Sequence, residues 1–261
     1  MLRIVLENLK KTYVTGGETI RALNDVSLNV RPGELLAIVG YSGCGKTTLL
    51  RHVAGLDRPD SGALRFFDGE TPLNGPGRIG YVFQEPRLLP WKTVYRNLEL
   101  ALRHVDVSAA PDRIIHSVLA LVGLAAFADA YPAELSGGMA QRASLARALC
   151  RDPDLLLMDE PLGALDALTR THLQMEIAAI RQVRPVTTLF VTHDVSEAVY
   201  LADRVVVMDR GGIVHVEDVT LPYPRDPAGV ELAEVKARVL DTIMRECPLT
   251  LASIRLFANP S

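Results

Sequence analysis

Cysteine is scarce in this chain of 261 residues and forms no recognisable pattern. Cys44, Cys150 and Cys247 are odd in number and stand far apart. Their spacing fits neither a zinc-binding motif nor the even-numbered framework of a disulfide-rich secreted domain. We therefore expect free thiols in a reducing compartment.

The chain also lacks an excess of basic residues. It has 28 Lys and Arg against 31 Asp and Glu, which gives a formal net charge of −3. This balance excludes a broad positive field for nucleic acid, and we expect no nucleic-acid partner. Any phosphate group that the chain binds must be held by local geometry.

No hydrophobic run is long enough to cross a bilayer. The longest apolar stretch covers residues 118–128, roughly half of the 20 residues that a membrane-spanning helix needs. The first residues, MLRIVLENLKK, are too polar for a signal peptide. We expect the chain to be cytosolic, or to be held at a membrane by a partner.

The chain does contain an alternation of apolar runs and helical patterns. Residues 35–39 form a continuous apolar run that ends at Gly40, which predicts a strand buried on both faces. A helix is expected after Gly45, because residues 47–53 contain no breaker. Further strands are expected at residues 2–5, 28–30, 78–83, 155–158 and 188–192. This alternation favours an α/β fold with a parallel sheet wound on both faces.

Between residues 83 and 155 the pattern becomes helical. Apolar residues recur at helical spacing over residues 94–102 and again over 115–122. The dipeptide Pro111-Asp112 is a start signal between them. We therefore predict a helical insertion over about residues 90–150.

The end of the chain is predicted to hold a hairpin and one more helix. Residues 204–208 and 213–216 flank Asp-Arg-Gly-Gly, which favours a turn. A helix is expected to start at Asp226-Pro227. Its apolar face would contain Leu232, Val235, Val239 and Ile243. The residues from Pro248 onward carry no pattern that predicts structure.

Residues 40–47, GYSGCGKT, fit the phosphate loop G-x4-G-K-T between an apolar strand and a helix. Gly43 and Gly45 allow backbone N–H groups to turn inward, and these groups bind an anion together with the helix N-terminus. Lys46 would reach the terminal phosphates, and Thr47 would offer its hydroxyl to Mg²⁺. The expected nucleotide contacts are Gly40, Tyr41, Ser42, Gly43, Cys44, Gly45, Lys46, Thr47 and Thr48.

Residues 155–160, LLLMDE, supply two carboxylates at the end of a buried strand. Ligands bind at the carboxyl ends of strands in such sheets. We expect Asp159 to hold Mg²⁺ and Glu160 to orient or deprotonate the attacking water. Alone, this pattern is an ordinary strand end. Together with the phosphate loop it indicates a P-loop NTPase, a class that includes kinases, GTPases and helicases.

A second anion-binding motif narrows this class. Residues 135–149, LSGGMAQRASLARAL, place Ser136, Gly137 and Gly138 at the start of a helix, where a capping side chain and free N–H groups attract an anion. Two such motifs can serve one ATP if they come from different subunits, which predicts a homodimer with shared sites. Here the chain resembles the ATP-binding cassette ATPases, whose signature motif is LSGGQ. The resemblance covers roughly residues 2–220.

The resemblance implies a P-loop NTPase (RecA-like) core with an N-terminal antiparallel β subdomain and an inserted α-helical subdomain. The ATPase domain would cover residues 1–225, and residues 226–261 would form a C-terminal helix and tail. Met139 replaces the commoner Gln of the signature, and Gly163 replaces the Ser that more often precedes the Ala-Leu-Asp sequence.

The same resemblance implies roles for four more residues. Tyr13 would stack on adenine, with an ordinary surface or core tyrosine as the lesser alternative. Gln84 would contact Mg²⁺ and water, and Asp166 would contact the partner's phosphate loop. His193 would contact the γ-phosphate. Glu160, His193, Gln84 and Lys46 are thus the candidate catalytic residues, and Thr47, Gln84 and Asp159 the candidate magnesium ligands.

Leu88, Leu89 and Trp91 in the sequence QEPRLLPW could form a groove for a short helix of a membrane permease, or could simply pack in the core. The segments FQEPRLLPW, GALDALTR and LPYPRD are similar to the nitrate, sulfonate and taurine branch of bacterial importers. That branch implies separate permease subunits, a periplasmic binding protein that acts indirectly, and a peripheral position on the cytoplasmic face of the inner membrane. A soluble cassette ATPase and a nucleotide-sensing module without catalysis remain alternatives.

Overall fold

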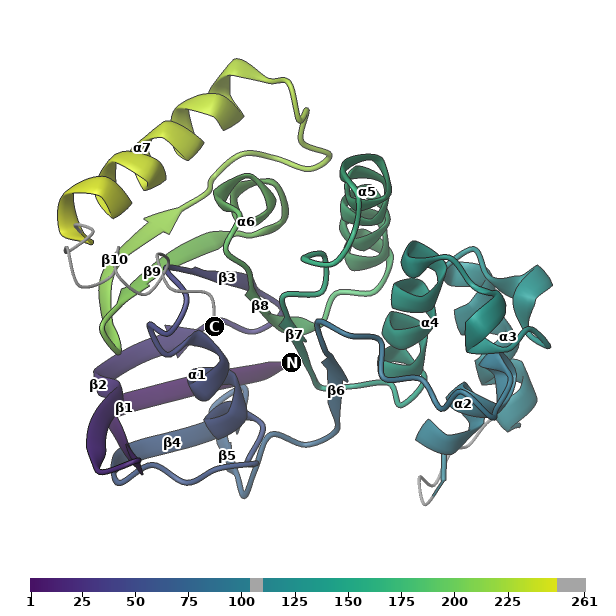
Figure 1. Cartoon of the computed structure of the whole chain (residues 1–261), viewed down its shortest axis with the longest axis horizontal. Helices are drawn as coiled ribbons and strands as arrows, with labels where there is room; N and C mark the ends of the chain where they lie inside the picture. The colour runs from purple at the N-terminus through teal and green to yellow at the C-terminus, as the bar shows by residue number, and fades with distance from the viewer. Residues whose placement is uncertain (104–109, 248–261) are drawn as a thin grey trace.

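The computed structural model describes residues 1–103 and 110–247. They form two sheets, of four and six strands, with helices around them (Figure 1). The six-stranded sheet has the order β10-β9-β3-β8-β7-β6, and its strands are parallel except for β10. This confirms the predicted α/β class with an N-terminal antiparallel sheet.

The strands of the central sheet match the apolar runs of the sequence. They are β3 (Leu35–Val39), β6 (Ile79–Val82), β7 (Leu155–Asp159), β8 (Thr187–Val191), β9 (Arg204–Asp209) and β10 (Gly212–Asp218). Every residue of β3 is buried, as the continuous apolar run predicts. The strand can be apolar throughout because Leu36 and Ile38 enter one core cluster while Leu35 and Ala37 enter the other.

The antiparallel sheet holds β1 (Leu2–Thr15), β2 (Glu18–Val30), β4 (Ser61–Asp68) and β5 (Thr71–Leu73) in the order β2-β1-β4-β5. The predicted strands at its start were too short, because shifts of register beyond Leu6 interrupt the alternation of β1. Strands β4 and β5 were not predicted. Phe66 is the single buried residue of β4, so the strand carries no apolar stripe.

Helix α1 (Lys46–Val53) packs between the two sheets, and α5 (Ala167–Val183), α6 (Val195–Leu201) and α7 (Val230–Glu246) pack on the other face of the central sheet (Figure 1). Helix α7 begins three residues later than predicted. The reason is a turn, in which the carbonyl and carboxylate of Asp226 accept hydrogen bonds from the N–H groups of Gly229 and Ala228. Leu232, Val235 and Val239 are buried, as predicted. The segment from Pro248 lies outside the described residues.

The insertion contains α2 (Val94–Ala101), α3 (Pro111–Leu121) and α4 (Gly137–Leu149), with short 3₁₀ turns at Ala125–Phe127 and Pro132–Glu134. Pro111 is the first residue of α3, as its start signal predicts. The division of the chain at residue 225 remains a prediction. Within residues 1–103 and 110–247, no helix has both the length and the apolar character to span a bilayer.

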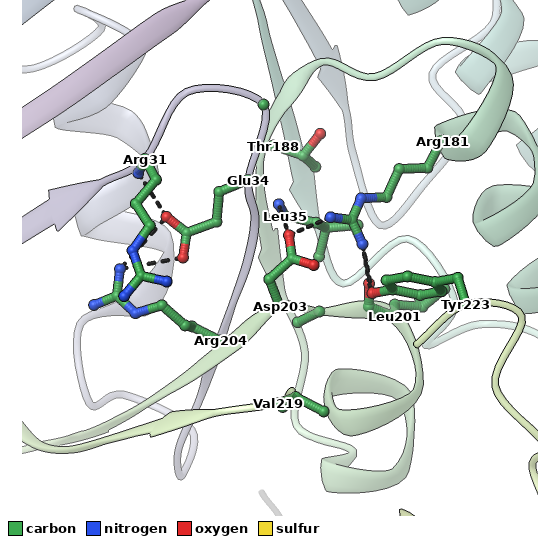
Figure 2. Close-up of polar contacts among 12 residues, drawn as sticks. Arg31, Glu34, Leu35, Arg181, Thr188, Leu201, Asp203, Arg204, Val219 and Tyr223 are labelled. Atoms are coloured by element: carbon green, nitrogen blue, oxygen red, sulfur yellow. Dashed lines mark hydrogen bonds and ion pairs between the residues drawn. The ribbon is translucent and has the colours of Figure 1, made fainter. Parts of the chain in front are cut away.

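A group of polar contacts fixes the amino ends of the central strands (Figure 2). Asp203 accepts a hydrogen bond of 3.0 Å from the N–H of Leu35 at the start of β3, and it also pairs with Arg181 of α5. The guanidinium of Arg181 and the hydroxyl of Tyr223 both donate to the carbonyl of Leu201, at the end of α6. These contacts hold α5 and α6 against the sheet edge opposite the carboxyl ends of the strands.

Candidate functional site

The phosphate loop joins β3 to α1 at the carboxyl edge of the central sheet. Gly45 has φ = 106°, and a Cβ at this position would lie 2.2 Å from the carbonyl oxygen of Ala22. Only glycine tolerates both the left-handed backbone and the close approach of β2. The phosphate loop thus packs closely against strand β2. The N-terminus of α1, which follows the loop, is of the kind that binds anions.

Lys46 is 5% exposed and its ammonium group is held over the loop. The Nζ atom donates hydrogen bonds to the carbonyls of Gly40 at 2.8 Å and Tyr41 at 3.0 Å. Cys44 is also buried, and burial raises the pKa of its thiol. The side chains of Tyr41, Ser42 and Thr47 are exposed, and that of Thr48 is half-buried. The predicted loop residues therefore lie together before and within the first turn of α1, and their contact with a nucleotide stays a prediction.

The two predicted magnesium ligands of the loop and of β7 are in direct contact. The Oγ1 hydroxyl of Thr47 donates a hydrogen bond of 3.1 Å to Oδ1 of Asp159. The hydroxyl of Tyr81 on β6 lies 3.4 Å from the other carboxylate oxygen. Burial raises the pKa of Asp159, with a further rise from the charge of Glu160. A half-buried carboxylate beside a hydroxyl is a set of hard oxygen donors that fits Mg²⁺.

Glu160 and His193 meet at the ends of β7 and β8. The Nδ1 atom of His193 lies 3.2 Å from Oε2 of Glu160. Glu160 has φ = 47°, an unusual value for a residue with a side chain, and its N–H donates to the carbonyl of Val191 at 2.9 Å. Such strained residues are concentrated at functional sites. The turn of the chain at Glu160 brings its carboxylate out of the strand and against the imidazole.

Gln84 lies beside the same carboxylate. A Cβ on Gly163 would stand 3.6 Å from Nε2 of Gln84 and 3.7 Å from Oε2 of Glu160. The departure from Ser at position 163 therefore leaves open a small space between the amide and the carboxylate. Of the predicted catalytic residues, Gln84 and Glu160 both lie near Gly163, and Glu160 contacts His193.

The predicted signature residues and Asp166 form a second group, at the adjacent starts of α4 and α5. Ser136 caps α4 by accepting a hydrogen bond from the N–H of Met139 at 3.3 Å, and Asp166 caps α5 by accepting one from Thr169 at 3.1 Å. Gly138 is buried, and a Cβ there would lie 2.3 Å from Cγ2 of Thr169. The signature glycine thus has a packing role within the chain in addition to any contact with phosphate.

These two groups are apart within one chain. Figure 1 shows α4 and α1 separated across β6 and β7. In the described part of the chain, no hydrogen bond joins residues 136–138 to residues 40–48.

The side chain of Tyr13 on β1 is held by a hydrogen bond. Its hydroxyl donates a hydrogen bond of 2.5 Å to Oδ2 of Asp57, which follows α1. This bond, above all, lowers the pKa of Asp57 to about 2. The Nζ of Lys11 lies 5.4 Å from the centre of the Tyr13 ring. The ring is held beside the end of α1, and its contact with adenine remains a prediction.

Two residues of the site were not predicted from the sequence: Tyr81, which contacts Asp159, and Arg170, which contacts the loops around Asp166 and His193. Tyr81 could have been found by its position in the strand beside the Leu155–Asp159 run, because a polar tip in a buried strand requires a partner. Arg170 carries no such local signal, since arginine on a helix is usually a solvated residue.

The loop after Gln84 borders an open groove of about 660 Å³ in the helical insertion. Aromatic and charged side chains line it, among them Trp91, Tyr95, Arg96, His116 and Tyr131. Trp91 is 70% exposed, whereas Leu88 packs against the core. At Leu88 the structure shows packing against the core, while the groove for a permease helix formed by Leu88, Leu89 and Trp91 stays a prediction. Of the three, Trp91 is the residue that lines the open groove.

The comparisons with known proteins agree with this geometry. The family described as ABC transporter matches residues 23–163. The aliphatic sulfonates import ATP-binding protein SsuB of Cupriavidus necator is 50% identical over 229 residues, covering 87% of this chain and 74% of that protein. The nitrate import ATP-binding protein NrtC of Synechococcus elongatus is 47% identical over 223 residues, covering 85% of this chain and 34% of that protein.

Among solved structures, a dimeric ATP-binding cassette in a post-hydrolysis state, bound to ADP and Pi, is similar in fold. It has a TM-score of 0.72 and 30% sequence identity, and the match covers 84% of this chain and 100% of that one. The order of the motifs and the geometry of the site agree with the family that the sequence identity indicates. The chain belongs to the ABC transporter family, as an ATP-binding subunit that hydrolyses ATP.

Proposed function

We propose that this chain is the ATPase subunit of a bacterial importer for a small anion such as a sulfonate, taurine or nitrate, with the transport path in separate permease subunits. The observation that carries the proposal is the identity of 50% over 229 residues to a sulfonate import ATP-binding protein. The nitrate import protein, at 47% identity, supports the same branch.

In this proposal Glu160 orients or deprotonates the attacking water, and His193 holds the transferred γ-phosphate. The contact of 3.2 Å between the two side chains supports this, because each fixes the orientation of the other. Gln84 also contacts the water in this proposal. Lys46 neutralises charge on the terminal phosphates, with Gly40 and the rest of the loop as N–H donors.

Thr47, Asp159 and Gln84 are the side chains that would hold Mg²⁺. The cation, when bound, would screen the negative charge of the phosphate oxygens. The close approach of Thr47 to Asp159 supports this assignment, since it places two oxygen donors at one point. Tyr81 holds the carboxylate of Asp159 in place from β6.

The chain is proposed to act as a homodimer in which Ser136, Gly137 and Gly138 of one protomer complete the site formed by the phosphate loop of its partner. Asp166 would meet the partner's phosphate loop, and Tyr13 would stack on adenine within its own chain. The separation of the two groups within one chain, and the similarity to a dimeric cassette, support this arrangement.

The groove lined by Trp91, Tyr95 and Tyr131 is proposed to receive a cytoplasmic helix of the permease. Docking there would place the chain at the cytoplasmic face of the inner membrane. A periplasmic binding protein would act on the permease and reach this chain only indirectly.

Reconstitution tests the proposal. The chain is combined with a candidate permease pair and binding protein in proteoliposomes, and ATP-dependent uptake of labelled taurine, an alkanesulfonate and nitrate is measured. We expect uptake of one of these anions that Glu160→Gln abolishes. Trp91→Ala should uncouple uptake from ATP hydrolysis while the purified subunit keeps its own turnover. ATP hydrolysis that never responds to any permease would favour the soluble cassette ATPase instead.

A further inference from the structure

Arg170, in the first turn of α5, contacts two loops of the candidate site at once. Its Nη2 donates a hydrogen bond of 3.0 Å to the carbonyl of Leu165, next to Asp166. Its Nη1 lies 3.9 Å from Oδ2 of Asp194, and its Nε lies 3.7 Å from Oε1 of Glu197. The guanidinium therefore joins the loop that ends at Asp166 to the start of α6.

The two carboxylates that Arg170 meets are hydrogen-bonded to residues on both sides of His193. The hydroxyl of Thr192 donates to Oε2 of Glu197 at 2.5 Å and accepts from the N–H of Asp194 at 3.0 Å. Asp194 also caps α6 by accepting from the N–H of Ser196 at 2.7 Å. The position of the His193 loop thus depends on Asp194 and Glu197.

Charge and burial support this link, although both ion pairs are longer than a hydrogen bond and the buried Nε of Arg170 has no hydrogen-bond partner among the described residues. Glu197 is 3% exposed, and a carboxylate so deeply buried needs a nearby cation. Arg170 supplies that cation with a planar group whose donors have a fixed geometry. Because the carbonyl of Leu165 is bonded to the same plane, a displacement of the loop at Asp166 also displaces the groups that hold His193.

We propose that Arg170 is a positioning residue that couples the Asp166 loop to His193, so that contact of a partner subunit with residues 163–166 orients the histidine for hydrolysis. This inference rests on the roles proposed above for His193 and Asp166. Arg170 touches neither nucleotide nor water in this scheme. Its removal should lower turnover and leave nucleotide affinity unchanged.

The test replaces Arg170 with Met in the full chain and measures ATP turnover, nucleotide affinity and thermal unfolding. Misplacing a reacting group by about 1 Å costs on the order of 10²-fold, so we expect kcat to fall at least about tenfold with the Kd for ATP within about twofold. Arg170→Lys should restore part of the rate. An unchanged kcat, or losses of kcat and ATP affinity in equal proportion, would overturn the proposal.

Arg181→Met is the matched control. Arg181 lies on the same helix and also contacts α6, but at its other end, through the carbonyl of Leu201 and the carboxylate of Asp203 (Figure 2). The control should lose stability while kcat stays within about twofold of wild type. An equal loss of kcat in both variants would mean that Arg170 only braces α5 against α6.

A double variant separates positioning from the burial of charge. Arg170→Met leaves Glu197 buried without its cation and can impair folding, whereas Arg170→Met combined with Glu197→Gln removes both charges. We expect the double variant to regain its unfolding temperature and to keep the low kcat, because the bond to Leu165 is still missing. Recovery of kcat together with stability would contradict the proposal.

Glu160→Gln serves as the reference variant for the proposed site. If Glu160→Gln keeps full turnover, the proposed site itself is wrong, independently of the role of Arg170.

Discussion

The imidazole of His193 lies 3.2 Å from the carboxylate of Glu160, a residue 33 positions earlier in the chain. The contact forms because β7 and β8 are adjacent parallel strands that end at the same edge of the sheet. It joins the proposed water-activating group to the proposed γ-phosphate contact.

Replacing Glu160 with Gln should therefore leave ATP binding intact and stop hydrolysis. We expect the Kd for ATP to change little and kcat to fall about 10²-fold or more, because a positioned base contributes that much. Equilibrium binding and phosphate release measure the two quantities. Glu70→Gln is the control, since that side chain is 96% exposed. Turnover above a tenth of the wild-type rate would remove Glu160 from its role.

Asp159→Asn should reduce the gain in ATP affinity that Mg²⁺ provides. The ATP affinity measured without Mg²⁺ should change less. The substitution removes a negative charge beside Thr47 but keeps an oxygen for its hydroxyl. Calorimetric titrations of ATP with and without Mg²⁺ measure this difference. We expect turnover to fall about 10²-fold, the order seen when one preorganised polar contact is lost. A variant that gains as much affinity from Mg²⁺ as wild type would exclude Asp159 as a ligand.

Gly138→Ala should destabilise the fold by contact with α5. The new methyl group would overlap Cγ2 of Thr169, and overpacking of this kind costs about 1–3 kcal/mol in the free energy of unfolding. Urea denaturation measures the loss. The additional change Thr169→Ser removes the opposing methyl group and should restore most of it. If the double variant is no more stable than Gly138→Ala, the packing explanation fails.

Glu197 should make the free energy of unfolding fall as pH rises. Burial raises the pKa of its carboxyl above 4.5, and Asp194 adds to the rise, although Thr192, Arg170 and His193 oppose it. Between about pH 4.5 and the raised pKa, the folded chain thus keeps a proton that the unfolded chain has lost. Stability is lost from about pH 4.5 up through the raised pKa and is constant above it.

Urea unfolding of wild type and Glu197→Gln across this range checks the sign. The difference, wild type minus variant, should fall with rising pH, since glutamine does not titrate. A difference that stays flat or increases would show that the carboxyl is not destabilised by burial.

Prediction from the sequence succeeded best for the helices and strands that are marked by a pattern of neighbouring residues. The bounds of β3 match because an apolar run meets a glycine loop, and α1 follows the same loop. Strand β4 was missed because its pairing with β1 is remote in sequence and it buries only Phe66.

The same contrast between local signals and long-range contacts applies to the residues of the candidate site. Lys46, Asp159, Glu160 and His193 each follow a recognisable strand and could be placed from the sequence. Tyr81 contacts Asp159, and Arg170 pairs with Asp194 and Glu197, so both act on neighbours that only the tertiary structure brings near.

Mixing two inactive variants tests most directly whether the sites are shared between subunits. Lys46→Ala should weaken ATP binding, and Ser136→Glu places a negative charge where the γ-phosphate should bind. A mixed dimer then holds one site with both defects and one with neither. After random mixing, half of the dimers are mixed, so we expect about a quarter of the wild-type turnover. Shared sites would be contradicted if mixed dimers form but turn over ATP no faster than the separate variants. Full turnover by a strictly monomeric chain would also contradict them.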